Sequence, residues 1–161
     1  MMKRLKVNDK IPDFTLIDQH GNLFHLEKHL GKSNLVVYFY PKDDTPGCTA
    51  EACQFRDQYE EFRDVSAEVI GMSADTPASH LAFAKKHRLT FTLLSDTDNR
   101  VRKMFGVQSD LFGLLPGRVT YVVDRKGVIQ YIFNSQLNAR KHVSEALRVL
   151  RETEIKGSAT I

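Results

Sequence analysis

The sequence predicts an α/β fold in which helices cover both faces of one sheet. Short apolar stretches typical of buried strands alternate along the chain with stretches that repeat apolar residues at helical spacing. A chain of 161 residues, 42% of them hydrophobic, has the size of one domain, and such a domain buries about two-thirds of its unfolded surface. We therefore expect a single domain over residues 1–161, with a frayed tail from about residue 154.

The first predicted elements are a β-hairpin and a central strand. Phe14–Ile17 and Leu23–Leu26 are rich in β-forming residues and flank a loop that contains glycine, Asp18–Asn22. Leu35–Tyr40 is continuously apolar, which is typical of a strand covered on both faces. Pro41 ends this strand.

Helices and strands then alternate. Apolar residues recur at helical spacing from about Cys48 to Phe62, which predicts an amphipathic helix. A second buried strand is predicted over Ala67–Ser73. The signal Asp75-Thr76-Pro77 then starts a helix that should run to about His87.

The last third of the chain predicts a short strand, a helix, a second hairpin and a final helix. Phe91–Leu94 is the strand, and Gly106 ends the helix that carries Val101. Val119–Val123 and Val128–Phe133 form the hairpin across a turn that contains glycine. The apolar face of the final helix comprises Val143, Ala146, Leu147 and Leu150.

Charge and composition argue against several classes of partner. The net charge of +3 is spread along the chain, whereas nucleic-acid binding requires a clustered basic surface. No apolar run approaches the ~18–20 residues of a membrane span, and no apolar segment follows the basic start as in a secretory signal. Two cysteines are too few for a disulfide scaffold or a zinc site. We expect a cytoplasmic protein without metal, membrane or nucleic acid, in which a close cysteine pair indicates redox chemistry.

The segment between the central strand and the next helix holds the first cysteine. Thr45-Pro46-Gly47 forms a tight turn, and Cys48 falls in the first helical turn at the carboxyl edge of the sheet, where reactive sites gather. Unpaired backbone N–H groups and the helix dipole stabilise a thiolate at this position. The alternative is a buried structural cysteine, but the turn leaves little to cover the sulfur.

Cys53 follows five residues later on the same predicted helix. Five helical residues advance ~7.5 Å and turn ~140° net, which puts the two Cα atoms ~8.5 Å apart. A disulfide tolerates at most ~7 Å between them. Either Cys53 is inert, or the first turns of the helix unwind when the bond forms. Cys53 points away from the apolar stripe that Cys48 shares with Ala52 and Phe55, so it is the easier of the two to release.

These residues resemble a known family. Pro41-x-x-x-Thr45-x-x-Cys48 is similar to the peroxiredoxin signature, and Thr-Pro-Gly-Cys-Thr with a second cysteine five positions on resembles the bacterioferritin-comigratory-protein branch, peroxiredoxin Q. The likeness continues through 91–96 and through 117–124, and so spans nearly the whole chain. It implies a thioredoxin-like fold with an N-terminal β-hairpin extension, and no cofactor.

The resemblance also implies a reaction. Cys48 is the peroxidatic thiol, which reduces hydrogen peroxide or organic hydroperoxides and becomes a sulfenic acid. Cys53 is the resolving thiol, which closes an intramolecular disulfide that thioredoxin recycles, with glutaredoxin as another possible reductant. The expected role is antioxidant defence, and a monomer is favoured because both thiols lie in one chain.

Five further residues receive roles from the same resemblance. The Thr45 hydroxyl hydrogen-bonds the peroxide, Pro41 shields the sulfur from water, and Arg118 orients and charges the pocket. Gly47 supplies a backbone donor to the substrate. Glu51 matches a carboxylate that is frequent in the wider family but less fixed in this branch.

Two other functions stay open at this point. A thioredoxin-like disulfide oxidoreductase is disfavoured because four residues, rather than two, separate the cysteines. A holdase or binding module on the same fold would make the thiols dispensable. The six histidines show no paired ligand spacing, and we expect at least five of them to be solvated; they are His20, His25, His29, His80, His87 and His142.

Overall fold

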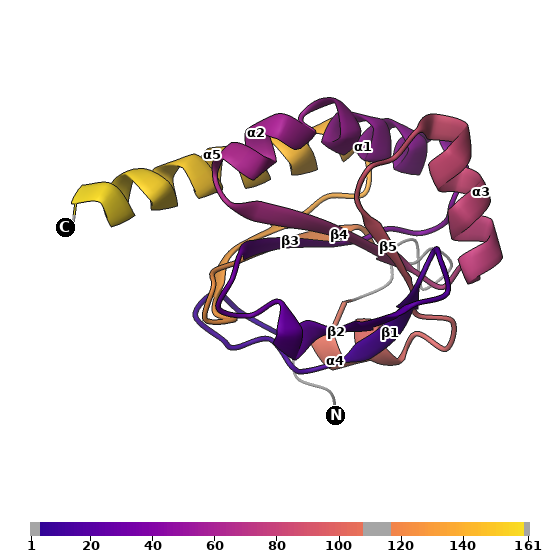
Figure 1. Cartoon of the computed structure of the whole chain (residues 1–161), viewed down its shortest axis with the longest axis horizontal. Helices are drawn as coiled ribbons and strands as arrows, with labels where there is room; N and C mark the ends of the chain where they lie inside the picture. Colours follow the sequence, from indigo (N-terminus) through magenta and orange to yellow (C-terminus); the bar gives the residue numbers. More distant parts are fainter. Residues whose placement is uncertain (1–3, 108–116, 160–161) are drawn as a thin grey trace.

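The structure, a computed structural model, describes residues 4–107 and 117–159, with side chains described as far as residue 153. Its centre is a seven-stranded sheet in the order β2-β1-β5-β4-β3-β6-β7 (Figure 1). The strands are β1 (Thr15–Asp18), β2 (Leu23–His25), β3 (Asn34–Phe39), β4 (Ala67–Ser73), β5 (Thr92–Ser95), β6 (Val119–Val123) and β7 (Ile129–Asn134). The helices are η1 (Leu26–Lys28), α1 (Pro46–Asp57), α2 (Tyr59–Asp64), α3 (Pro77–His87), α4 (Arg100–Phe105) and α5 (Ala139–Ala159).

Parallel pairing places the ends of three strands at one edge of the sheet. β3 pairs in parallel with β4, and β4 with β5, while β6 runs antiparallel to β3. The β1–β2 hairpin joins this sheet through an antiparallel pair with β5. The predicted α/β class and the N-terminal hairpin are therefore confirmed, and the carboxyl ends of β3, β4 and β5 lie together.

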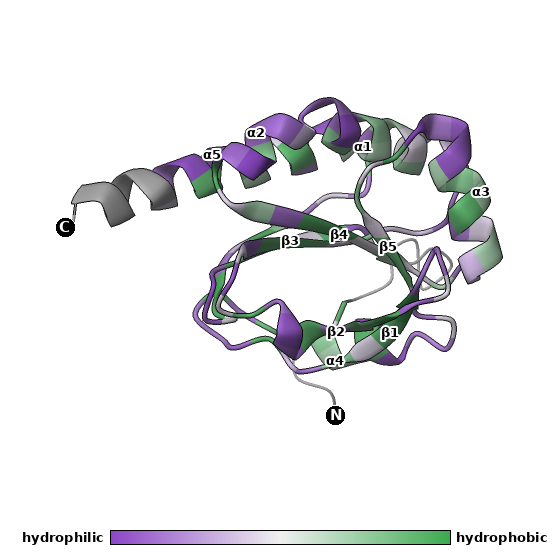
Figure 2. Cartoon of the chain, in the orientation of Figure 1, coloured by the Kyte–Doolittle hydropathy of each residue, from purple (hydrophilic) through white to green (hydrophobic). Residues whose placement is uncertain are grey.

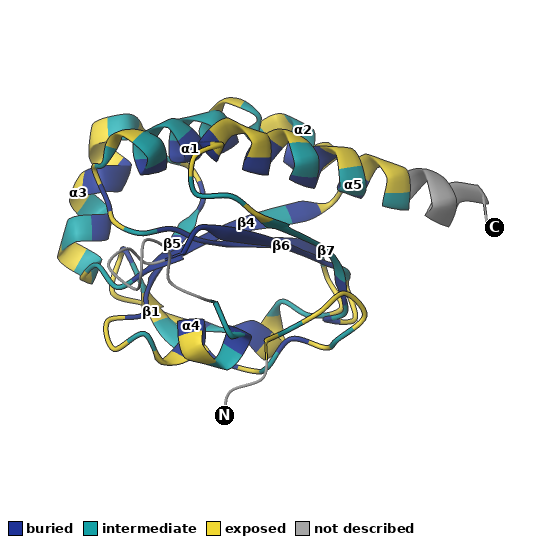
Figure 3. Cartoon of the chain, turned by 180° about the vertical axis from the view of Figure 1, so that it is seen from behind, coloured by how far each residue is buried: buried dark blue, intermediate teal, exposed yellow. Residues whose placement is uncertain are grey.

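Each face of the sheet has its own apolar core. α1, α2, α3 and α5 cover one face (Figure 1), where Tyr38, Phe55 and Phe62 pack. The other face is covered by α4, η1 and the N-terminal segment, and its core includes Phe14 and Phe105. Figure 2 shows the apolar residues along the strands, and Figure 3 shows β4 and β6 mostly buried between the two layers. β7, at the edge of the sheet, is mostly half-buried. Helices on both faces are confirmed, although the second face carries only short ones.

The helix predicted from about Cys48 to Phe62 is two helices in the structure. α1 ends at Asp57 and α2 begins at Tyr59, because Gln58 has φ −103° and ψ 18°, outside the helical range. α5 extends to Ala159, so fraying from about residue 154 stays a prediction. Within the described ranges 4–107 and 117–159, no helix combines the length and apolar character that crossing a bilayer requires.

Candidate active site

The start of α1 lies at the carboxyl edge of the sheet. Pro46 occupies the first helical turn, and Thr45 precedes it in an extended conformation. The Thr45 hydroxyl donates to the Lys42 carbonyl at 3.0 Å and makes no capping hydrogen bond. The N–H groups of the first turn are therefore not occupied by this side chain, and they point toward the place where an anion would sit. Cys48, the third residue of α1, lies in this turn as predicted.

Arg118 contacts the sulfur of Cys48 directly. It precedes β6, and its Nη2 donates to Cys48 Sγ at 3.3 Å. A Cβ atom added to Gly47 would lie 3.0 Å from the same Nη2, so glycine leaves room for the guanidinium. Cys48 is only 2% exposed, more buried than we expected, because the sulfur packs in the core with Ala52 and Phe55. The buried sulfur thus has a charged hydrogen-bond donor beside it.

Glu51 lies on the other side of the same guanidinium. Arg118 Nη1 donates to Glu51 Oε1 at 2.7 Å, and the Glu51 side chain is fully buried. Burial raises the pKa of Glu51 to about 8, although the Arg118 guanidinium acts to lower it. At neutral pH this carboxyl is mostly protonated, so the positive charge of Arg118 is available to the sulfur.

Cys53 is half-buried, and both thiols are free. It lies in α1, in the same unbroken helix as Cys48. The geometric prediction therefore applies to this structure: the two sulfurs cannot form a disulfide until part of α1 unwinds.

Two other expected site residues lie on the loop between β3 and α1. Pro41 comes two residues after the end of β3, and Thr45 immediately precedes α1; both are half-buried. Contacts join Gly47, Cys48, Glu51 and Arg118, whereas the chain path brings Pro41 and Thr45 to the same edge.

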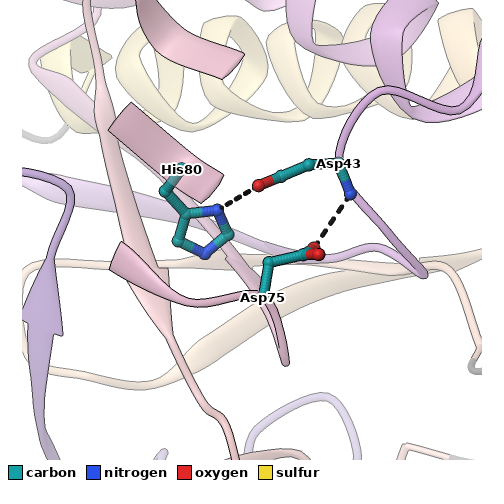
Figure 4. A group of neighbouring side chains, drawn as sticks. All are labelled: Asp43, Asp75 and His80. Carbon is teal, nitrogen blue, oxygen red and sulfur yellow. Dashed lines mark hydrogen bonds and ion pairs between the residues drawn. The ribbon is translucent and has the colours of Figure 1, made fainter. Parts of the chain in front are cut away.

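A second polar cluster, which we call the loop anchor, holds this loop. It consists of Asp43, Asp75 and His80 (Figure 4). Asp43 Oδ2 lies 2.7 Å from His80 Nδ1, and the Asp43 N–H donates to Asp75 Oδ2 at 2.9 Å. Tyr40 and Ser79 donate their hydroxyls to Asp43 at 2.6 Å and 2.9 Å.

The loop anchor joins the loop to β4, β5 and α3. His80 Nε2 lies 3.0 Å from the Leu94 carbonyl, so both ring nitrogens face oxygen atoms. The facing oxygens of Asp43 and Asp75 already accept hydrogen bonds from the protein. We therefore interpret the cluster as a fixed support for the loop before Cys48.

Two buried side chains support the site from further away. Arg102 of α4 donates to the Gly117 carbonyl at 2.8 Å and to the Tyr40 carbonyl at 2.9 Å, joining the segments that precede Arg118 and Cys48. His142 of α5 is fully buried, and its Nδ1 lies 3.7 Å from Glu51 Oε2.

Comparison with known proteins identifies the family. The profile of the AhpC/TSA family matches residues 7–132, most of the chain. The chain belongs to the AhpC/TSA family of peroxiredoxins.

The relatives of this peroxiredoxin include several proteins named peroxiredoxin Q. The chloroplastic peroxiredoxin Q of Triticum aestivum is 59% identical over 140 residues, covering 87% of this chain and 64% of the relative. That of Sedum lineare is 57% identical, with 87% and 75% covered. The chain thus spans about two-thirds, or slightly less, of the length of several relatives that it matches.

Solved peroxiredoxin structures share the fold. The peroxidoxin BcpB of Mycobacterium tuberculosis superposes with a TM-score of 0.86 at 37% identity, covering 92% of this chain and 98% of that chain. The bacterioferritin comigratory protein of Xanthomonas campestris gives a TM-score of 0.79 at 30% identity, with 87% and 91% covered. The thioredoxin-like peroxiredoxin fold expected from the motifs is confirmed.

The expected cytoplasmic location is corrected by these names. The plant relatives at 56–59% identity are named as chloroplastic proteins, so the expected cytoplasmic location does not stand. The expectation rested on the absence of a recognisable targeting segment, and such an absence does not determine a location.

Sequence reasoning missed the buried histidines. His80 and His142 are both fully buried, so the expectation of at least five solvated histidines is wrong. The spacing contained a signal: His80 precedes Phe83 and Ala84 by three and four residues, and His142 precedes Ala146 by four. These intervals place each ring on the buried face of its helix. No comparable signal marked Arg102.

Proposed function

We propose that this peroxiredoxin is a thiol-dependent peroxidase in which Cys48 attacks the hydroperoxide. The observation that carries the proposal is the hydrogen bond from Arg118 Nη2 to the sulfur of Cys48, at the open N-terminus of α1. A thiolate held by a guanidinium and a helix terminus is the nucleophile that peroxide reduction needs.

The proposed first step transfers one oxygen to Cys48. The thiolate attacks one peroxide oxygen, the S–O bond forms as the O–O bond breaks, and the leaving oxygen departs with the electron pair and takes up a proton. Arg118 and the backbone N–H groups near Gly47 and Cys48 are donors for the developing charge. The Thr45 hydroxyl joins them once it turns from the Lys42 carbonyl, to which it donates in the present structure. Pro41 shields the sulfur from water. The products are a Cys48 sulfenic acid and water or an alcohol.

Glu51 acts on this step through Arg118. Its contact at 2.7 Å fixes one side of the guanidinium, so that the other side is directed at Cys48. Glu51 is therefore proposed as part of the substrate-binding pocket and not as a base, because burial keeps its carboxyl mostly protonated at neutral pH.

The proposed second step uses Cys53. Its thiol attacks the sulfenic acid of Cys48, the S–S bond forms, and water leaves. This step requires α1 to unwind, and a thioredoxin-type reductant, or alternatively a glutaredoxin, then reduces the disulfide. The Xanthomonas campestris relative is described with an alkyl peroxide reduction activity, which supports organic hydroperoxides as substrates alongside hydrogen peroxide.

We also propose that the chain works as a monomer and forms one domain. Both cysteines lie in α1 of the same chain, so the disulfide needs no second copy. One continuous sheet runs through the described residues, with a core on each face, which supports a single folding unit.

Two substitutions and mass spectrometry test this function. Cys48→Ser should abolish peroxide consumption, whereas Cys53→Ser should reduce about one peroxide per chain and then stop, even with thioredoxin present. The peroxide-treated wild type should lose two hydrogens through an intrachain bond between Cys48 and Cys53. Peroxide consumption by Cys48→Ser at the wild-type rate would contradict the proposal. Insulin reduction without peroxide turnover would instead favour a disulfide oxidoreductase.

A further inference from the structure

A row of polar side chains runs through the core behind Cys48. Arg118 Nη1 contacts Glu51 Oε1 at 2.7 Å, and Glu51 Oε2 lies 3.7 Å from His142 Nδ1. The side chains of Glu51 and His142 are both fully buried. Within the described part of the chain, Glu51 Oε2 has no hydrogen-bond partner. A charged oxygen in this position is strongly disfavoured unless the facing group, His142, can donate to it.

The hydrogen bonds of His142 settle where its proton lies. Its Nε2 is 2.6 Å from the Ser135 carbonyl, which can only accept, so Nε2 carries the proton. Its Nδ1 is 2.8 Å from the Thr120 hydroxyl, which therefore donates to it. Burial lowers the pKa of His142 to about 4, against the raising effect of the Ser135 carbonyl, so the ring is neutral at physiological pH.

In this tautomer Nδ1 carries a lone pair and no hydrogen, so the ring atom that lies 3.7 Å from Glu51 Oε2 offers that oxygen no donor. An ionised Oε2 facing that lone pair would have no donor, whereas a protonated Oε2 places its hydrogen between the two atoms. His142 thus disfavours the carboxylate form of Glu51, in the same direction as burial. A donor at the same place would do the opposite, because it would stabilise the carboxylate.

The other ionisable groups around Glu51 and His142 do not take over the role of His142 in keeping Glu51 protonated. Tyr38 of β3 faces Glu51 and Cys48, but burial raises its pKa well above the ordinary value, so it stays neutral. Arg102 approaches Cys48 from α4, with its guanidinium engaged by two carbonyls. Arg118 is the cation that contacts both Glu51 and Cys48.

We propose that His142 is a positioning residue that keeps Glu51 protonated and thereby leaves the positive charge of Arg118 for the Cys48 thiolate. An ionised Glu51 would form a neutral pair with Arg118 and weaken its effect on the sulfur. The inference rests on the proposed peroxidase function, since it concerns the reactive form of the same thiol.

Two substitutions around Nδ1 should act in opposite directions. His142→Asn places an amide at the Nδ1 position, and its NH₂ can donate to Glu51 Oε2. The pH midpoint of thiolate formation, read by ultraviolet absorbance, should then rise by about one unit, with about a tenfold lower rate with hydrogen peroxide below that midpoint. Thr120→Val removes only the hydroxyl that competes for Nδ1, so the midpoint should stay unchanged or fall. A general disturbance of the core would raise the thiolate midpoint in both variants, and this result would overturn the proposal. An unchanged midpoint in His142→Asn would overturn it as well.

A double-mutant cycle and infrared spectroscopy complete the test. With Glu51→Gln as the background, His142→Asn should no longer shift the midpoint, because the titrating carboxyl is gone. Infrared spectroscopy tests the proposal even if His142→Asn does not fold. At neutral pH the wild type should show the carbonyl band of a protonated, buried carboxyl, and Glu51→Gln should lack this band. Absence of the band from the wild type would overturn the proposal. The titration needs no peroxide, so a wild type that titrates as expected but ignores peroxide would contradict the proposed function alone.

Discussion

At the residue scale, the site depends on close approach of one guanidinium to one sulfur. Gly47 permits this approach, since a Cβ there would lie 3.0 Å from Arg118 Nη2. Gly47→Ala should displace the guanidinium and lower the second-order rate constant with hydrogen peroxide by about tenfold, less than the ~10²–10³ lost with a whole transition-state donor. Stopped-flow kinetics of the reduced protein measures this rate constant.

The same substitution carries its own control for folding. Alanine has the higher helix propensity by about 1 kcal/mol, and position 47 lies in α1, so the melting temperature should not fall markedly. A slower reaction in a protein of undiminished stability would identify displacement of Arg118 as the cause. An unchanged rate constant would show that the contact is not needed at this distance.

Glu51 gives the stability of the protein a pH dependence that can be measured. Its pKa is about 8 in the folded chain against an ordinary value of 4.5. Between these values the folded chain holds a proton that the unfolded chain has lost, so the free energy of unfolding falls as the pH rises. In Glu51→Gln this loss should be absent, and the curve should be flatter than that of the wild type.

Urea unfolding at the two ends of that pH window tests the sign. Glu60→Gln is the matched control, because this carboxylate is exposed on α2. The control should follow the wild-type curve. If wild type and Glu51→Gln gave parallel curves, the carboxyl would be ionised in the folded protein, contrary to the value above.

At the element scale, the proposed second step requires α1 to change. Cys48 and Cys53 lie in one helix of 12 residues, in which a disulfide between them does not fit. Oxidation should therefore lower the helical circular dichroism signal and speed hydrogen exchange between Thr49 and Arg56. Peroxide treatment of Cys53→Ser should leave both quantities as in the reduced protein. Identical spectra for reduced and oxidised wild type would contradict an unwinding of α1.

The elements were largely predictable because local patterns decide them. The continuous apolar run that ends before Pro41 and the turn before Cys48 predicted both β3 and the place of Cys48 in the first turn of α1. Contacts between distant segments could not be predicted in this way. Arg118 lies 70 residues from Cys48, and only the motif connected them before the structure did. The break at Gln58 also escaped the helical spacing, which continues across it to Phe62.

At the scale of the whole molecule, the two faces of the sheet cooperate in building the site. α4 covers the face opposite α1, yet Arg102 reaches the carbonyls of Tyr40 and Gly117. Arg102→Met leaves both carbonyls without this donor and should cost about 1–3 kcal/mol in the free energy of unfolding. It should also slow peroxide reduction, because Gly117 adjoins Arg118.

Lys103→Met is the matched control for this prediction. Lys103 is the next residue of α4 and is exposed, so its loss should change the free energy of unfolding by less than about 0.5 kcal/mol. Chemical denaturation and the rate with hydrogen peroxide should be measured for both variants. If Arg102→Met and Lys103→Met changed the free energy of unfolding equally, the hydrogen bonds from Arg102 to the site would not stabilise the protein.

In the proposed cycle, the loop anchor holds the chain on one side of Cys48 only. Asp43, upstream of Cys48, is held by Asp75, which follows β4, and by two residues of α3, and these contacts do not involve α1. In the proposed cycle, the opening of α1 should therefore displace Cys53 further than Cys48. A reductant that breaks the proposed disulfide should return a chain whose loop before Cys48 has kept its contacts, so that recovery of the reactive form requires only the refolding of α1.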